Sequence, residues 1–265
     1  MIKMIKNKNL RNIYNRIYKK GEEKHYTSFI VKGGPTDEAI EVLKSLSSWK
    51  GKRVLDVCCG TGYFAYLAAK RGAKVLGIDF SESAIDFARK TYSLPNLEYK
   101  NLDISKIVGK YDVVVSVGTL EHMDNPFNAL RQMKKHLNPK GKIIVTCPNW
   151  TNPRGYVLMT LKHLFNIPIT LADLYYLTPL DFVRWAKKLK MDLSWRTFDR
   201  PWGHGEVMIK DFRRRLPLIF ESARIRIPHK NVDSLINWLE NNVLAFNNDL
   251  PHSGALGIYI FSSKK

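Results

Sequence analysis

Three aspartates in the first half of the sequence stand where short apolar runs end. Asp56 lies in RVLDV, Asp79 ends KVLGID, and Asp103 follows LEYKNL. If these runs are parallel strands, their carboxyl ends meet at one edge of a sheet, where ligands bind in such folds. Carboxylates at that edge would attract a cation or accept hydrogen bonds from hydroxyl groups. The sequence therefore predicts a polar binding site at this edge.

A glycine turn directly follows Asp56 and narrows the choice of ligand. Gly60 and Gly62 lie in the spacing G-x-G-x-x-A, which a dinucleotide-binding turn also shows, so the spacing alone does not decide. A pyrophosphate beside this turn would be repelled by Asp56. S-adenosylmethionine carries an ammonium and a sulfonium group and no phosphate, and glycines let the backbone approach it without a Cβ. We therefore expect Asp56 to face the cationic end of S-adenosylmethionine.

The other two aspartates suit the nucleoside part of the same ligand. Asp79, which comes 17 positions after Gly62, could accept both hydroxyl protons of the ribose diol. Asp103 could accept a hydrogen bond from the adenine amino group. Each aspartate has a structural alternative as a cap or turn residue, because Asp often follows a strand in that role.

The elements that must position these residues alternate along the chain. Runs at 53–57, 73–79, 97–102, 112–117 and 142–146 are typical of buried strands, and helices are expected to begin at Thr36, Ser81 and Asn125-Pro126. This alternation predicts a parallel sheet with helices on both faces. Two further strands are expected at 191–198 and 255–263.

Five segments, in this order and spacing, carry a family resemblance: VLDVCCGTG, GIDFSESAIDFA, NLDIS, YDVVVSVGTLEHMDNP and LNPKGKIIVTCPN. Over residues 36–149 the chain resembles the class I S-adenosylmethionine-dependent methyltransferases, in particular the ubiquinone-biosynthesis-like branch (methyltransferase type 11). The resemblance implies an α/β, Rossmann-like fold with a seven-stranded, mostly parallel sheet, an antiparallel last strand, helices on both faces and helical lid insertions. Phe80 and Ile104 would then flank the adenine as apolar walls, although packing alone would also explain them. The cofactor-binding residues that it implies are Asp56, Gly60, Gly62, Asp79, Phe80, Asp103, Ile104 and Val117.

The resemblance places Glu121-His122, after the fourth strand, where the transferred methyl group should lie. His122 could take a proton from a phenol, an enol or a hydroxyl near neutral pH. It could equally hydrogen-bond the loop backbone and shape the pocket. Some relatives bind a divalent metal with E-x-x-E-H at this site, but Gly118 stands at the position of the first Glu, so no metal is expected.

Substrate selection is expected outside the shared core. An arm at 1–35 is predicted to cover the cofactor, and the methyltransferase domain at 36–265 contains insertions at about 150–178 and 199–254 that we interpret as lids. In the second insertion, 232–243 has the apolar spacing of a packed helix. A basic run at 213–215 could dock an anionic partner. The candidate substrate residues are Asn149, Arg154, Trp202 and His204.

The chain of 265 residues has a formal net charge of +19, which allows several partners. Such a charge can attract nucleic acid, an anionic membrane or an acidic small molecule, or it can simply solvate the surface. We expect methyl transfer to an oxygen or carbon atom of a small, anionic or aromatic molecule. The alternatives are an RNA methyltransferase and a peripheral-membrane enzyme acting on an isoprenoid or lipid. The apolar segment at 155–177 supports the membrane alternative.

The cysteines and the first residues bear on location. Cys58, Cys59 and Cys147 have neither a disulfide nor a zinc-site pattern, and the adjacent pair is expected to pack as small buried side chains under the cofactor turn. Residues 1–21 lack the apolar core of a signal peptide, so a cytoplasmic protein is expected. The sequence makes no prediction of the oligomeric state.

Overall fold

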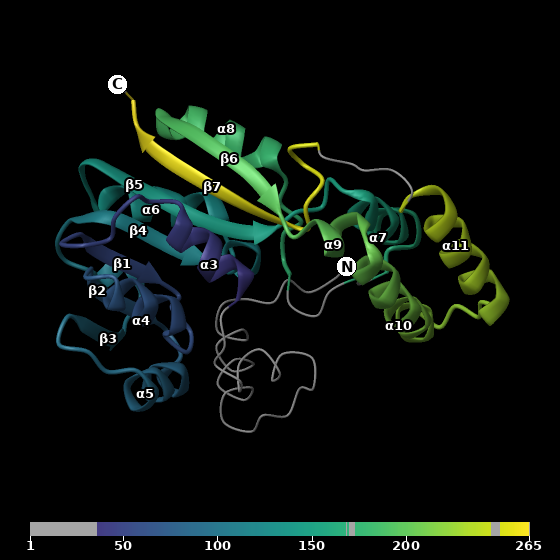
Figure 1. Ribbon diagram of the computed structural model, residues 1–265, viewed down its shortest axis with the longest axis horizontal. Coiled ribbons are helices and arrows are strands. Elements are labelled where there is room, and N and C mark those ends of the chain that lie inside the picture. The colour runs from purple at the N-terminus through teal and green to yellow at the C-terminus, as the bar shows by residue number, and fades with distance from the viewer. Residues whose placement is uncertain (1–35, 168, 170–172, 245–249, 265) are drawn as a thin grey trace. The chain divides into compact units, whose positions relative to one another are not determined.

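The computed structural model describes residues 36–167, 169, 173–244 and 250–264 (Figure 1). The predicted arm at 1–35 lies outside these residues. The described chain forms two compact units. We call residues 36–147, 182–194 and 258–264 the sheet unit, and residues 148–181 and 195–257 the helical unit. The predicted domain boundaries stay a prediction.

The fold contains one seven-stranded sheet with the strand order β3-β2-β1-β4-β5-β7-β6. Neighbouring strands from β3 to β5 pair in parallel, and β7 runs against its neighbours β5 and β6 (Figure 1). This is the Rossmann-like architecture expected from the sequence. The strands are β1 (Arg53–Val57), β2 (Lys74–Asp79), β3 (Leu97–Asn101), β4 (Tyr111–Val117), β5 (Leu137–Pro148), β6 (Met191–Phe198) and β7 (Leu256–Ser263).

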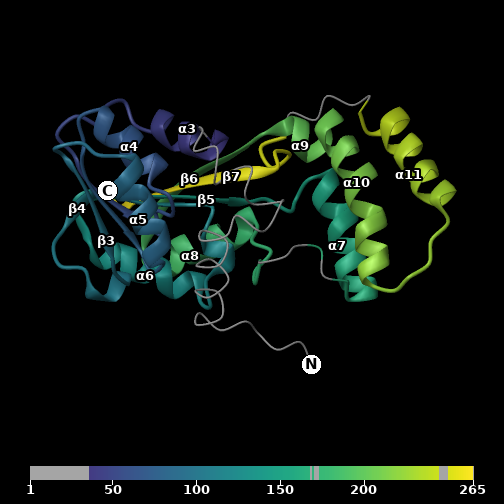
Figure 2. The ribbon, with the colours of Figure 1, turned by 90° about the horizontal axis from the view of Figure 1, so that it is seen from below.

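The central strands are buried because they are apolar on both faces. In β1 and β4, Leu55 pairs with Val114, and neither side chain is exposed to solvent. Such runs suit a parallel sheet that is covered by helices on both sides. Figure 2 shows α3 (Asp37–Lys44) and α4 (Tyr63–Lys70) on one side of the sheet, and α6 (Pro126–Lys135) and α8 (Pro179–Leu189) on the other.

Side-chain caps fix where the helices of the sheet unit begin. Thr36 Oγ1 accepts a hydrogen bond from the Ala39 N–H at 3.1 Å, and Ser81 Oγ accepts one from the Ala84 N–H at 3.3 Å at the start of α5 (Glu82–Thr91). Asn125 does the same for α6, where Pro126 occupies the first turn. All three predicted helix starts are confirmed, because each cap satisfies an N–H that has no partner within the helix.

Strand β5 differs from the prediction at its beginning. It begins at Leu137, five residues before the predicted strand, and its register against β4 shifts between the Tyr111 and Val113 pairs. Lys140 has a positive φ of 65°, and a Cβ on Gly141 would lie 2.9 Å from the Asn138 carbonyl oxygen. The extra residues therefore form a bulge in the first half of the strand.

Apolar packing also organises the helical unit. It contains α7 (Pro153–Phe165), α9 (Arg200–His204), α10 (Glu206–Ser222) and α11 (His229–Asn242). The predicted helix at 232–243 is confirmed, because Val232, Ile236 and Leu239 of α11 are buried in one cluster with residues of α7 and α10. Among the described helices, none is both long and apolar enough to cross a membrane.

Candidate functional site

Asp56 and Asp79 lie together at one edge of the sheet, as predicted. Parallel pairing aligns Asp56 with Gly77, so that β1 and β2 end side by side. Both carboxylates are buried, with 2% of Asp56 and 7% of Asp79 exposed. Asp79 Oδ2 accepts the Gly60 N–H at 3.0 Å, and Oδ1 accepts the Ser81 N–H at 2.8 Å. Asp79 thus joins the glycine turn to the start of α5, and each of its oxygens keeps a second lone pair for a ligand hydroxyl.

Asp56 is the more perturbed of the two carboxyl groups. Its Oδ2 has no hydrogen-bond partner among the residues that the structure describes. Burial raises the pKa of Asp56 from 3.8 to about 8, and the nearby charge of Asp79 adds to the effect. A buried carboxylate that lacks donors is stabilised by a cation in contact with it. The ammonium group of S-adenosylmethionine is such a cation, so this residue fits the expected cofactor.

The glycine turn adopts left-handed backbone conformations, with φ of 51° at Gly60 and 82° at Gly62. A Cβ on Gly62 would lie 2.5 Å from the hydroxyl of Tyr99, which donates a hydrogen bond to the Gly62 carbonyl oxygen at 2.7 Å. Glycine is therefore required at position 62 by its own backbone and by a tyrosine of β3. Approach of the cofactor to the same backbone remains a prediction.

The two cysteines of the turn, Cys58 and Cys59, are kept in the thiol form. Burial raises the pKa of both thiols well above the usual value, and the charges of Asp56 and Asp79 raise them further. A thiol with a raised pKa is a poor nucleophile, because the thiolate is the reactive form. Both side chains are only partly buried, whereas the sequence predicted buried ones, and their lack of a chemical role stays a prediction.

Asp103, at the end of β3, has a local role that the sequence left open. It is exposed, and its Oδ1 accepts the Ser105 N–H at 2.8 Å, which caps the short helix η1 (Ile104–Lys106). Its contact with the adenine amino group stays a prediction. The apolar candidates Phe80, Ile104 and Val117 are all partly exposed, as the walls of a pocket would be.

The end of β4 carries the candidate base. Thr146 Oγ1 accepts the Gly118 N–H at 3.0 Å, which holds the turn before the short helix η2 (Leu120–His122). Glu121 is buried, whereas the His122 side chain is 13% exposed, and His122 Nε2 lies 3.8 Å from Glu121 Oε1. The imidazole and the carboxylate thus lie side by side at the end of β4, and their part in proton transfer stays a prediction.

One carboxylate of this site was missed from the sequence. Glu38 belongs to α3, yet its Oε2 would lie 3.1 Å from a Cβ on Gly118. The sequence signal at Glu38 was that of an acid in the first turn of a helix, which is common and points to no ligand. Glu38 therefore adds α3 to the three segments β1, β2 and η2 that carry acidic side chains at this edge of the sheet.

The candidate substrate residues lie in the helical unit, where most of them bind one another or the backbone. The Asn149 side chain, which is 1% exposed, donates to the carbonyl oxygens of His252 and Gly254, each at 2.7 Å. His204 Nδ1 lies 3.2 Å from the Ser253 carbonyl oxygen. Trp202 is half-buried. Their contact with a substrate stays a prediction.

Arg154 is held by a buried ion pair. Its Nε donates to Asp211 Oδ2 at 3.2 Å, and its guanidinium lies 5.8 Å and 5.6 Å from the ring centroids of Trp150 and Trp202. Burial lowers the pKa of Arg154 to about 10. Asp211 also pairs with Arg214 and Arg215, so this carboxylate organises three cations within the helical unit.

The basic run at 213–215 is thus largely paired. Arg213 donates to both carboxylate oxygens of Glu240 in α11, at 3.0 Å and 3.2 Å, while its two neighbours bind Asp211. In the described part of the chain, no group of three or more His, Cys, Asp or Glu side chains is placed to hold a metal ion.

Comparisons with known proteins agree with this architecture. Residues 36–210 match the family model described as a methyltransferase domain. The chain is 33% identical over 114 residues to the ubiquinone biosynthesis O-methyltransferase of Acinetobacter baylyi, which covers 40% of this chain and 48% of the relative. The enzyme of the same name from Dechloromonas aromatica is 27% identical over 164 residues, which is 58% of this chain and 70% of the relative. The chain thus spans about half the length of the first of these relatives.

A solved structure shares the fold at low sequence identity. The magnesium protoporphyrin IX methyltransferase from Synechocystis, with bound S-adenosylhomocysteine, superposes with a TM-score of 0.55 at 20% identity. The superposition covers 70% of this chain and 89% of that one. At this identity the likeness supports the fold alone.

Proposed function

The chain belongs to the methyltransferase-domain family and uses S-adenosylmethionine, and from this premise we propose that it methylates a hydroxyl oxygen, or an acidic carbon, of a small aromatic or anionic molecule. The observation that carries the proposal is the Glu121–His122 pair at the end of β4. Its imidazole is partly exposed, and its carboxylate is buried 3.8 Å away. The names of the curated relatives favour oxygen over carbon as the acceptor.

The acceptor must lose a proton when its oxygen or carbon becomes methylated. S-adenosylmethionine supplies a methyl group that is already activated by the positive sulfur, so the protein has to orient the acceptor and remove this proton. His122 is the group that we assign to proton removal, because a neutral imidazole is a base near pH 7. Glu121 stabilises the imidazolium that results, and its burial strengthens this interaction.

The cofactor end of the site is assigned to the strand ends. Asp56 would hold the methionyl ammonium group, and Asp79 would accept the ribose hydroxyls with the lone pairs that Gly60 and Ser81 leave unused. Phe80, Ile104 and Val117 would form the apolar walls beside them. The assignment gives the ammonium group of the cofactor a partner of opposite charge and the ribose hydroxyls a hydrogen-bond acceptor.

Replacement of His122 by Ala tests the proposal. Transfer of labelled methyl groups would be followed with a panel of small phenols, hydroxy acids and carbon acids, first with the native enzyme to find an acceptor. We expect His122→Ala to lower kcat by about 10² to 10⁴ and to remove the pH dependence of kcat below neutral pH. His229→Ala, at the exposed start of α11, is the matched control and should change neither.

Unchanged turnover of His122→Ala across the pH range would contradict proton removal by this residue. Failure of the native enzyme to methylate any member of the panel, together with methylation of RNA, would assign it to the RNA alternative. Binding to a nucleic acid or a membrane surface stays a prediction from the net charge of +19.

A further inference from the structure

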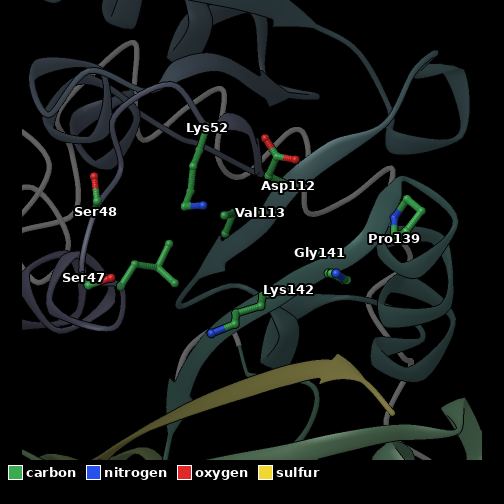
Figure 3. Close-up of a pocket in the computed structure, with 10 residues that line it drawn as sticks. Ser47, Ser48, Lys52, Asp112, Val113, Pro139, Gly141 and Lys142 are labelled. Atoms are coloured by element: carbon green, nitrogen blue, oxygen red, sulfur yellow. The ribbon is translucent and has the colours of Figure 1, made fainter. Parts of the chain in front are cut away.

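A cavity lies at the edge of the sheet opposite to Asp56 and Asp79. It has a volume of about 310 Å³ and lies where β1 and β4 begin and where β5 has its bulge (Figure 3). The strands of the sheet are parallel here, so the length of β1 separates this edge from the cofactor edge by about 16 Å. The polar side chains that line it are Ser47, Ser48, Lys52, Asp112, Lys140 and Lys142.

The lining is dominated by ammonium groups. Lys52 and Lys142 are half-buried and approach the cavity from opposite sides (Figure 3). Lys140 also belongs to the lining and is exposed. None of the three ammonium groups forms a hydrogen bond or an ion pair within 4.0 Å among the described residues, although Lys52 and Asp112 attract each other at longer range. Half-buried like charges that face one space repel each other and are less screened than charges at the open surface. An anion in the cavity would remove this repulsion.

Asp112 does not neutralise the cavity. Its Oδ2 accepts the Arg53 N–H at 2.8 Å, and its Oδ1 accepts from Asn138 Nδ2 at 2.8 Å. These two hydrogen bonds hold the pKa of Asp112 below its usual value, so that the group stays ionised. Three lysines and one aspartate therefore leave two positive charges in the lining.

The wall formed by β5 has a fixed shape. Lys140 adopts a left-handed conformation, and Gly141 is the residue that leaves room for the Asn138 carbonyl oxygen. Bulges of this kind redirect side chains from the regular alternation of a strand. The bulge puts two lysines, at 140 and 142, on the same cavity.

We propose that this cavity binds the phosphate group of a small phosphorylated molecule. A phosphate monoester carries about −1.5 to −2 charges at neutral pH, which matches the two uncompensated charges of the lining. Lysines bind phosphate as point charges, and the hydroxyls of Ser47 and Ser48 can add hydrogen bonds. The volume is at the lower end of the range for small-molecule pockets, about 300 to 1,000 Å³, so it admits a phosphate with a small organic group.

Calorimetric titration of the full chain with inorganic phosphate and with glycerol phosphate tests the proposal. We expect saturable binding with one site per chain, and at least tenfold weaker binding to Lys52→Gln/Lys142→Gln. The control Lys187→Gln/Lys210→Gln removes the same charge from two exposed positions and should change the affinity less than twofold. Tighter binding of glycerol phosphate than of inorganic phosphate would assign the site to an esterified ligand, and equal binding would assign it to free phosphate.

Two results would overturn the proposal. One is the absence of saturable binding to the native chain up to about 10 mM of either compound, well above a millimolar Kd. The other is an equal loss of affinity in the cavity variant and in the control variant, which would show that the net charge alone attracts phosphate. If the double cavity variant melts at a lower temperature than the control, Lys140→Gln provides the same comparison at an exposed position.

Discussion

Binding of S-adenosylmethionine should become stronger as the pH rises towards 8, because Asp56 must lose a proton to face an ammonium group. In the free protein, burial raises the pKa of Asp56 to about 8, so the carboxyl group is mostly protonated at neutral pH. A bound cation favours the carboxylate and lowers this pKa. Cofactor binding should therefore release a proton over the range in which free Asp56 is protonated.

The size of the effect follows from the pKa. With a pKa of about 8, the ionised fraction of Asp56 rises about 30-fold between about pH 5.5 and about pH 7.0, because each pH unit below the pKa is a factor of ten. The cofactor ammonium stays protonated over this range, since α-amino groups titrate near pH 8. If binding requires the carboxylate, the Kd should fall by the same factor of about 30.

Isothermal titration calorimetry with S-adenosylhomocysteine, which keeps the ammonium group, can measure both the Kd and the number of protons released on binding. Titrations in buffers of different ionisation enthalpy should show release of up to about one proton per ligand near pH 6.5. Asp56→Asn should bind more weakly at pH 7 and lose the pH dependence. Asp192→Asn, which removes an exposed carboxylate, should keep it. An affinity of the native chain that is constant with pH, or an equal slope in Asp56→Asn, would refute the reasoning.

Three further predictions concern single side chains. Asp79→Ala should weaken S-adenosylhomocysteine binding by calorimetry, because it also frees the glycine turn from the Gly60 N–H contact, and an unaltered affinity would contradict that role. Gly62→Ala should destabilise the fold by about 1 to 3 kcal/mol more than Gly51→Ala in urea denaturation, since both glycines have positive φ but only Gly62 faces Tyr99. Equal losses would mean that Tyr99 moves aside freely. Asp211→Asn should cost about 3 to 5 kcal/mol of unfolding free energy, because buried Arg154 loses its partner, whereas Glu240→Gln, in an exposed pair, should cost at most about 1 kcal/mol. A loss at Asp211 no larger than that at Glu240 would show that the buried pair adds nothing.

The parts of the structure that the sequence predicted well depend on local chemistry. Helix starts at Thr36, Ser81 and Asn125 follow from side chains that bind an N–H three residues later, so the information lies within one turn. The strand ends at Asp56 and Asp79 follow from short apolar runs that end in a polar residue. Parallel pairing then brings these residues to one edge without further information.

Contacts between distant segments could not be predicted in this way. Arg154 binds Asp211, which lies 57 positions later in the chain and was not predicted as its partner, while its contact with a substrate stays a prediction. Glu38 approaches Gly118, which lies 80 positions later, and nothing in the helix of Glu38 indicates this contact. The bulge at Lys140 depends on the register between β4 and β5, which the single strand does not reveal. In each of these cases the contact or the local backbone depends on a segment that lies far away in the sequence.

The net charge of +19 and a site for a cationic cofactor are compatible because distance decides which charges matter. Two unit charges at about 4 Å interact by about 4 kcal/mol at an effective dielectric constant of about 20. Exposed lysines farther away than the Debye length of about 8 Å are largely screened by salt. The buried acidic groups Asp79 and Glu121, joined by Asp56 once a bound cation has ionised it, therefore control the potential at the cofactor edge. Lys52 and Lys142 control it at the opposite edge, so that one sheet can favour a cation at one end of its strands and an anion at the other.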